Sequence, residues 1–77
     1  MKDYSRSEVE NGINEWIIGK NGERNRLIMK LKLIDGLSYQ AIADILNSDD
    51  MPSSYHIEVR QIQRIIRECR TTLFRHI

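Results

Sequence analysis

The stretch VRQIQRIIRECR at residues 59 to 70 constrains the fold more than any other part of the sequence. Its apolar residues recur three and four positions apart, as they do along one side of an α-helix, whereas a half-buried strand would need strict alternation. Four arginines and two glutamines occupy most of the remaining positions. Because such a helix buries one side and exposes the other, the chain must supply other helices to cover the apolar side.

Helical geometry divides this stretch into a cationic and an apolar side. Relative to Arg60, Arg64 falls at about 40° and Arg67 at about −20° around the axis, and Gln61 and Gln63 lie on the flanks. The opposite side holds the residues that we expect to be buried: Ile62, Ile66, Cys69 and Leu73. Burial of one aliphatic side chain is worth about 1.5 to 3 kcal/mol, so packing should fix the rotation of the helix and turn the arginines outward.

The remaining sequence predicts three more helices and no strand. Apolar residues recur at helical spacing, and we expect helices at about residues 7–18, 22–35, 38–47 and 55–75, with a loop at 48–54. Ser7 followed by Glu10 is a candidate capping box, Gly36 a helix stop and Trp16 a core residue. The 77 residues therefore predict a single all-α domain, a small bundle of about four helices containing a helix-turn-helix with an enlarged turn.

Composition argues against several classes of protein. A lone Cys69 forms no internal disulfide, and His56 and His76 have no partner at metal-ligand spacing, so we expect no metal, no cofactor and a reducing cytoplasm as the compartment. No stretch approaches the roughly 20 apolar residues of a membrane span, which predicts no membrane partner. We expect the protein not to be an enzyme, because the sequence supplies no general base beside the thiol of Cys69 and contains no glycine-rich phosphate loop.

The net charge of +1 conceals two basic segments. Residues 20–37 and 58–77 each carry five basic and two acidic side chains, whereas residues 38–57 carry three acidic and no basic ones. In residues 20–37 the cations scatter around the predicted helix, which is typical of a solvated surface. In residues 58–77 they gather on one side, which favours a polyanionic partner.

The combination of arginine and glutamine favours DNA as that partner. Every amphipathic helix needs a charged side, but mixed lysine and glutamate would serve solubility equally well. Arginine can bond guanine O6 and N7 in the major groove, glutamine can bond adenine N6 and N7, and both can bind phosphate. We therefore predict double-stranded DNA as the partner.

Two strings carry a family resemblance. DGLSYQAIADILN at residues 35–47, followed by IEVRQIQRIIREC at residues 57–69, resembles the promoter-reading C-terminal helix-turn-helix domain of bacterial sigma factors and their small phage or mobile-element relatives. The matching residues are Gly36, Ser38, Tyr39, Ile42, Ala43 and Leu46 in the first string and Ile62, Ile66 and Cys69 in the second. RNRLIMKLKLIDG is similar to the helix that precedes them in the family, so the likeness spans residues 24–74.

The resemblance assigns candidate DNA contacts. It implies that the major groove is met by Arg60, Gln61, Gln63 and Arg64, and that Arg67 binds phosphate. It also places the N-terminus of the supporting helix against the DNA backbone, through Ser38, Tyr39 and Gln40. Two alternatives need no DNA: in them Ser38 serves only as a helix cap and Tyr39 only as an aromatic residue at the edge of the core.

The sequence departs from the family pattern at the turn. About nine extra residues, SDDMPSSYH at 48–56, separate two helices that the family joins tightly, so the angle between them is left to the structure. A longer turn before a string such as residues 62–66 is also similar to the C-terminal DNA-binding part of large serine recombinases. Both resemblances imply a helix presented to DNA.

These observations predict a sequence-specific DNA-binding transcriptional regulator, encoded by a phage or mobile element. About five phosphate contacts give only roughly 10⁻⁴ to 10⁻⁶ M affinity, so we expect help from a homodimer or from docking on RNA polymerase. Two alternatives remain open. One is a protein-interaction module that binds RNA polymerase or a phage protein without touching DNA, and the other is a small terminase-like DNA-recognition subunit.

Overall fold

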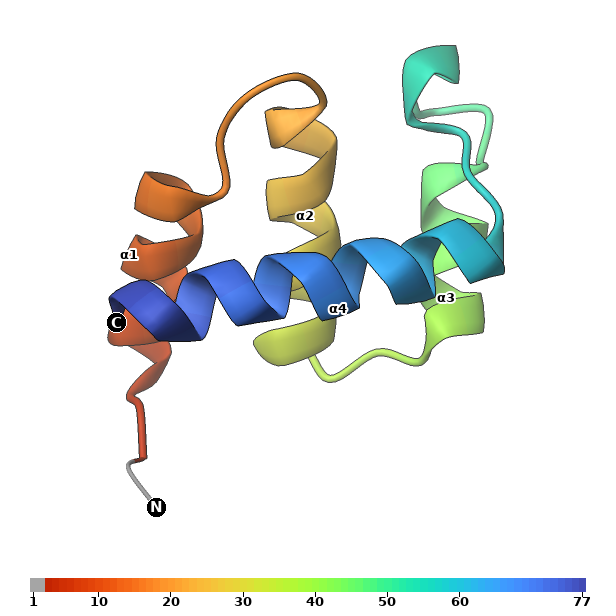
Figure 1. The fold of residues 1–77 in the computed structure, drawn as a ribbon. Coiled ribbons are helices and arrows are strands. Elements are labelled where there is room, and N and C mark those ends of the chain that lie inside the picture. The colour runs from red at the N-terminus through yellow and green to blue at the C-terminus, as the bar shows by residue number, and fades with distance from the viewer. Residues whose placement is uncertain (1–2) are drawn as a thin grey trace.

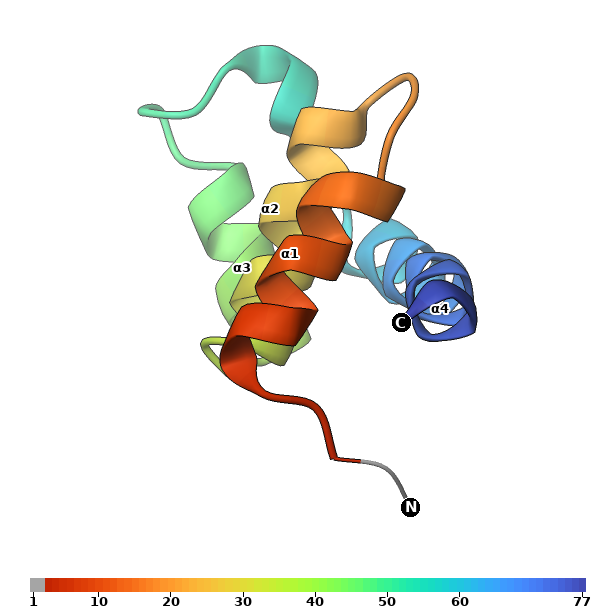
Figure 2. The same cartoon turned by 90° about the vertical axis from the view of Figure 1, so that its left-hand side faces the viewer.

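Helices occupy most of residues 3–77, the part of the chain that the computed structural model describes, and no strand forms among these residues. The elements in chain order are α1 (Arg6–Trp16), α2 (Gly22–Leu33), α3 (Tyr39–Leu46), the 3₁₀ turn η1 (Ser53–Tyr55) and α4 (Val59–His76). Helix α2 lies between α1 and α3, and α4 runs across all three (Figure 1). Viewed along its axis, α4 lies at one side of the molecule (Figure 2). The expected all-α fold of four helices is confirmed.

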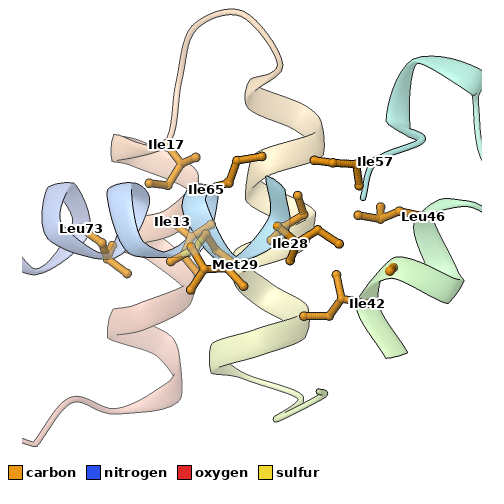
Figure 3. Packing of buried hydrophobic residues seen from close by; sticks show 12 residues of the cluster. Ile13, Ile17, Ile28, Met29, Ile42, Leu46, Ile57, Ile65 and Leu73 are labelled. Carbon is orange, nitrogen blue, oxygen red and sulfur yellow. The ribbon is translucent and has the colours of Figure 1, made fainter. Parts of the chain in front are cut away.

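The apolar side of α4 is buried, as its periodicity predicts. Ile62 and Leu73 are 0% exposed, and Ile65 and Ile66 are also buried. They join a single hydrophobic core with residues of the other helices, including Ile13, Ile28, Met29, Ile42 and Leu46 (Figure 3). Cys69 is only partly buried, because it lies nearer the rim of this core. Packing therefore fixes the rotation of α4.

Helix α1 begins one residue and ends two residues earlier than expected. Ser5, rather than Ser7, forms the capping box: Glu8 N donates to Ser5 Oγ and Ser5 N donates to Glu8 Oε1, each at 3.1 Å. Both serines are followed by glutamate at the same spacing, so sequence alone does not choose between them. The earlier start adds a backbone hydrogen bond from Val9 N to Ser5 O at 3.1 Å.

The crossing of α1 and α4 overturns one expectation. Gly12 is a point of close contact, because a Cβ there would lie 2.8 Å from both Leu73 Cδ1 and Ile77 Cγ2. Trp16 is only partly buried and lies outside the core: its indole stacks on His76 of α4, with 4.0 Å between ring centroids. The end of α1 therefore uses Trp16 to hold the last turn of α4.

Helix α2 is the central helix of the fold. Ile28 and Met29 are both 0% exposed, and α2 contacts the other three helices. The helix ends at Leu33, two residues before the expected boundary, and Gly36 follows with φ +70°, a conformation that favours glycine. None of the helices in residues 3–77 is long and apolar enough to cross a membrane.

The final helix begins at Val59, four residues later than expected. Residues 53–55 form the separate turn η1, and Ile57 is buried in extended chain just before α4. The Asn47 amide holds this segment, since Asn47 Nδ2 donates to Ile57 O and Asn47 Oδ1 accepts from Ile57 N, both at 2.8 Å. The loop at 48–56 is thereby closed at its base, and α3 and α4 remain in contact despite the extra residues.

Candidate nucleic-acid interface

The residues predicted to meet the major groove lie together on the outer side of α4. We call this surface, formed by Arg60, Gln61, Gln63, Arg64 and Arg67, the arginine side. All five side chains are exposed, and together with Glu68 they line a shallow hollow. Because one helix supplies the whole lining, the hollow is an open surface suited to a large partner rather than a cleft for a small molecule.

The guanidinium groups of the arginine side have no protein partner within residues 3–77. Those of Arg60, Arg64 and Arg67 make neither a hydrogen bond nor an ion pair with this part of the chain; the bond from Thr71 Oγ1, at 3.1 Å, goes to the backbone carbonyl of Arg67 and not to its guanidinium. Their charge is therefore not used to hold the fold together. It remains available to an external anion.

The two glutamines of this surface differ in their hydrogen bonds. Gln61 Oε1 accepts from Glu58 N at 3.1 Å, where it supports the start of α4. The same oxygen would accept from adenine N6 through its second lone pair, but its bond to Glu58 N already ties the Gln61 amide to the helix start. Gln63 is exposed and makes no such bond. Gln63 is therefore the glutamine of the arginine side that is ready for base contact.

The three candidate phosphate contacts on α3 all have roles within the protein. Ser38 Oγ accepts from Ala41 N at 3.1 Å and so caps the helix, as the alternative expectation held. Tyr39 packs at the edge of the core, and Lys32 Nζ lies 4.4 Å from its ring centroid. Gln40 Nε2 donates to Asp44 Oδ1 at 3.0 Å.

A groove between α3 and the start of α4 brings Gln40 and Gln61 to one surface, but not Ser38 or Tyr39. Its other polar residues include Asn47, His56 and Glu58, and no arginine or lysine lines it. Phosphate is repelled by carboxylates and attracted by cations. The groove therefore offers little to a phosphate, and the cationic surface lies farther along α4.

Two residues on α4 escaped the sequence reasoning. Arg70 and Arg75 are exposed and have no hydrogen bond or ion pair with any residue that the structure describes. The predicted DNA contacts end at Arg67, because the family resemblance places recognition residues near the helix start. The length of α4, which continues to His76, was the signal that could have found them.

The sole cysteine is not activated for nucleophilic chemistry. Burial raises the pKa of the Cys69 thiol, the nearby Glu68 carboxylate raises it further, and Arg24 of α2 acts in the opposite direction. The thiol is therefore protonated at neutral pH, and a thiol is a far weaker nucleophile than a thiolate. No group of His, Cys, Asp and Glu side chains in residues 3–77 is arranged to hold a metal ion.

Comparison of this chain with known protein families, curated proteins and solved structures gives no significant match. The likeness to the sigma-factor domain therefore rests on the motifs in residues 24–74 and stays a prediction.

Proposed function

We propose that this protein is a sequence-specific DNA-binding transcriptional regulator of the sigma-like helix-turn-helix type, encoded by a phage or mobile element. One observation carries the proposal: the buried apolar side of α4 directs an unpaired row of arginines away from the protein. The N-terminal half of α4, with Arg60, Gln63 and Arg64, reads base edges in the major groove. The proposal includes no catalytic step.

The spacing of the arginines supports a polyanionic partner over simple solubility. Helix α4 carries five arginines but only one acidic residue, Glu68. Arg60 and Arg64 are four positions apart, and Arg64 and Arg67 three, so like charges face each other along the exposed side. Each such pair destabilises a helix by about 0.2 to 0.5 kcal/mol. A bound polyanion removes this repulsion, whereas solvation alone would be met better by alternating charges.

The proposal includes a second contact that adds to the affinity of α4 for DNA. A single short helix with a few phosphate contacts binds DNA weakly, so the protein acts as a homodimer over two half-sites or by docking on RNA polymerase in the cytoplasm.

Binding of labelled duplex DNA over a salt series, together with selection of bound sequences from random duplexes, tests the proposal. We expect affinity to fall steeply with salt. Arg64→Ala should lower affinity for the selected sequence by about 1 to 3 kcal/mol, or roughly 5- to 160-fold, and should leave the circular dichroism spectrum unchanged. Lys20→Ala, which removes an exposed charge outside α4, is the matched control.

The opposite result would favour a different class of protein. Binding to a protein partner that is insensitive to salt and unaffected by Arg60→Ala combined with Arg64→Ala would contradict DNA recognition by α4. That outcome would instead support a protein-interaction module built on the same helices.

A further inference from the structure

The C-terminal half of α4 carries two exposed arginines, Arg70 and Arg75, that the proposed base-reading surface does not include. Neither guanidinium has a hydrogen bond or ion pair with residues 3–77, so the fold makes no use of either charge. On an α-helix, Arg70 falls at about −80° and Arg75 at about 60° relative to Arg60. The two side chains therefore diverge by about 140° around the axis.

An aromatic contact separates the two arginines. Phe74 falls at about −40°, between Arg70 and Arg75. It is partly buried, and the ring of Tyr4 packs on it with 5.3 Å between centroids. The two guanidiniums therefore leave the helix in different directions, with this apolar pair between them.

The separation of the two arginines fits the dimensions of duplex DNA. An angle of about 140°, a rise of about 7.5 Å and a side-chain radius of about 5.5 Å put the two groups about 13 Å apart on an ideal helix. The major groove of B-DNA is about 12 Å wide between its two backbones. A helix lying in that groove would direct one arginine towards each strand.

We propose that Arg70 and Arg75 bind phosphates on opposite strands, one on each side of the major groove that α4 occupies. This inference rests on the proposed function and adds that the two halves of α4 contact different parts of the DNA. The N-terminal half of the helix, with Arg60, Gln63 and Arg64, contacts base edges. The C-terminal half supplies the contacts that position the helix without reading sequence.

Salt dependence of binding tests the phosphate contacts. The full chain and the double variant Arg70→Gln with Arg75→Gln are titrated into a labelled duplex of mixed sequence at several salt concentrations. Loss of two phosphate contacts should reduce the slope of log affinity against log salt by about 1.8, since each contact contributes about 0.9. Affinity should fall by the same factor on every duplex, with the preferred sequence unchanged. Both arginines are exposed, so the urea midpoint should not move.

A matched double variant separates this effect from net charge. Lys20→Gln with Lys30→Gln removes the same two charges, and the side chains of Lys20 and Lys30 have no hydrogen bond or ion pair within residues 3–77. We expect this variant to keep the wild-type slope within about 0.3, well below the contribution of one phosphate.

Phosphate ethylation interference on a selected duplex tests the assignment to two strands. Arg70→Gln should abolish interference at a phosphate of one strand, and Arg75→Gln at a phosphate of the other. The inference would be overturned if both variants lost interference on the same strand, or if the double variant kept the wild-type salt slope. In either case, DNA binding by the wild type would still support the proposed function. If the wild-type chain binds no duplex even at 50 mM salt, where phosphate contacts are strong, the proposed function itself fails.

Discussion

Helices α2 and α4 are both basic, but the fold uses their cations differently. In α2, Arg26 Nη1 donates to Ile17 O at 2.7 Å, Lys32 Nζ donates to Leu37 O at 3.3 Å, and Arg24 Nε donates to Asn25 Oδ1 at 3.2 Å. All three residues are partly buried. The five arginines of α4 are exposed and have no such partner in residues 3–77. The segments 20–37 and 58–77 carry the same numbers of basic and acidic residues, but the fold uses their cations differently.

The position of each helix explains the difference. Helix α2 contacts the three other helices, and its partly buried Arg26 and Lys32 reach the carbonyl groups of the turns that flank it. Helix α4 lies across the outside of the bundle and buries only one side. Two cations of the central helix therefore hold turns, whereas those of the outer helix remain available for binding.

The largest expected effect is a loss of stability when a residue on the buried side of α4 is truncated. The difference between the cations of α2 and α4 depends on this buried side, because its packing turns the arginines of α4 outward. Ile62→Ala should lower the free energy of unfolding by about 2 to 5 kcal/mol, because it removes a fully buried side chain and leaves a cavity. A domain has only about 5 to 15 kcal/mol in all, so DNA binding should weaken together with the fold. Urea unfolding followed by circular dichroism measures the loss. Ile62→Val, with an expected loss of about 0.5 to 1.5 kcal/mol, is the conservative control.

A smaller change in stability tests directly whether the cations of α2 and α4 differ in their roles. Arg26→Ala should cost about 1.5 to 3 kcal/mol of stability, since it deletes a charged hydrogen bond to Ile17 O in a partly buried turn. Arg64→Ala removes the same kind of side chain from α4 and should change stability by less than about 0.5 kcal/mol. The two urea midpoints should separate clearly. Equal shifts would mean that the cations of α2 and α4 contribute alike to the fold.

The smallest expected effect is the pH dependence of stability that comes from the thiol of Cys69. Because the pKa of Cys69 is raised in the folded state, that state holds the proton more tightly than the unfolded chain does. The contribution of the Cys69 thiol to the free energy of unfolding is therefore fully present below the ordinary thiol pKa of 9.0. It is lost as pH rises through the raised pKa of the folded state. Urea midpoints between pH 8 and 10 should decline slightly less in Cys69→Ala than in the wild type. A steeper decline in the variant would contradict the direction of the shift.

Several features of the fold and site were predictable because they depend on neighbours in the sequence. The periodicity of residues 59–70 predicted which side of α4 is buried, and the Ser38 cap followed from residue type and position. The capping box of α1 was misplaced, because Ser5 and Ser7 offer the same spacing. Gln61 was assigned to DNA alone, although its bond to Glu58 N also follows a local rule of helix starts.

The sequence by itself determined that the chain is helical and that α4 has one apolar and one arginine-rich side, because side-chain period is a property of the helix alone. Only the tertiary structure decided which cations are bound to carbonyl groups, that Asn47 closes the long loop on Ile57, and that Trp16 stacks on His76. Those contacts join residues on different elements, and their formation depends on how the helices cross.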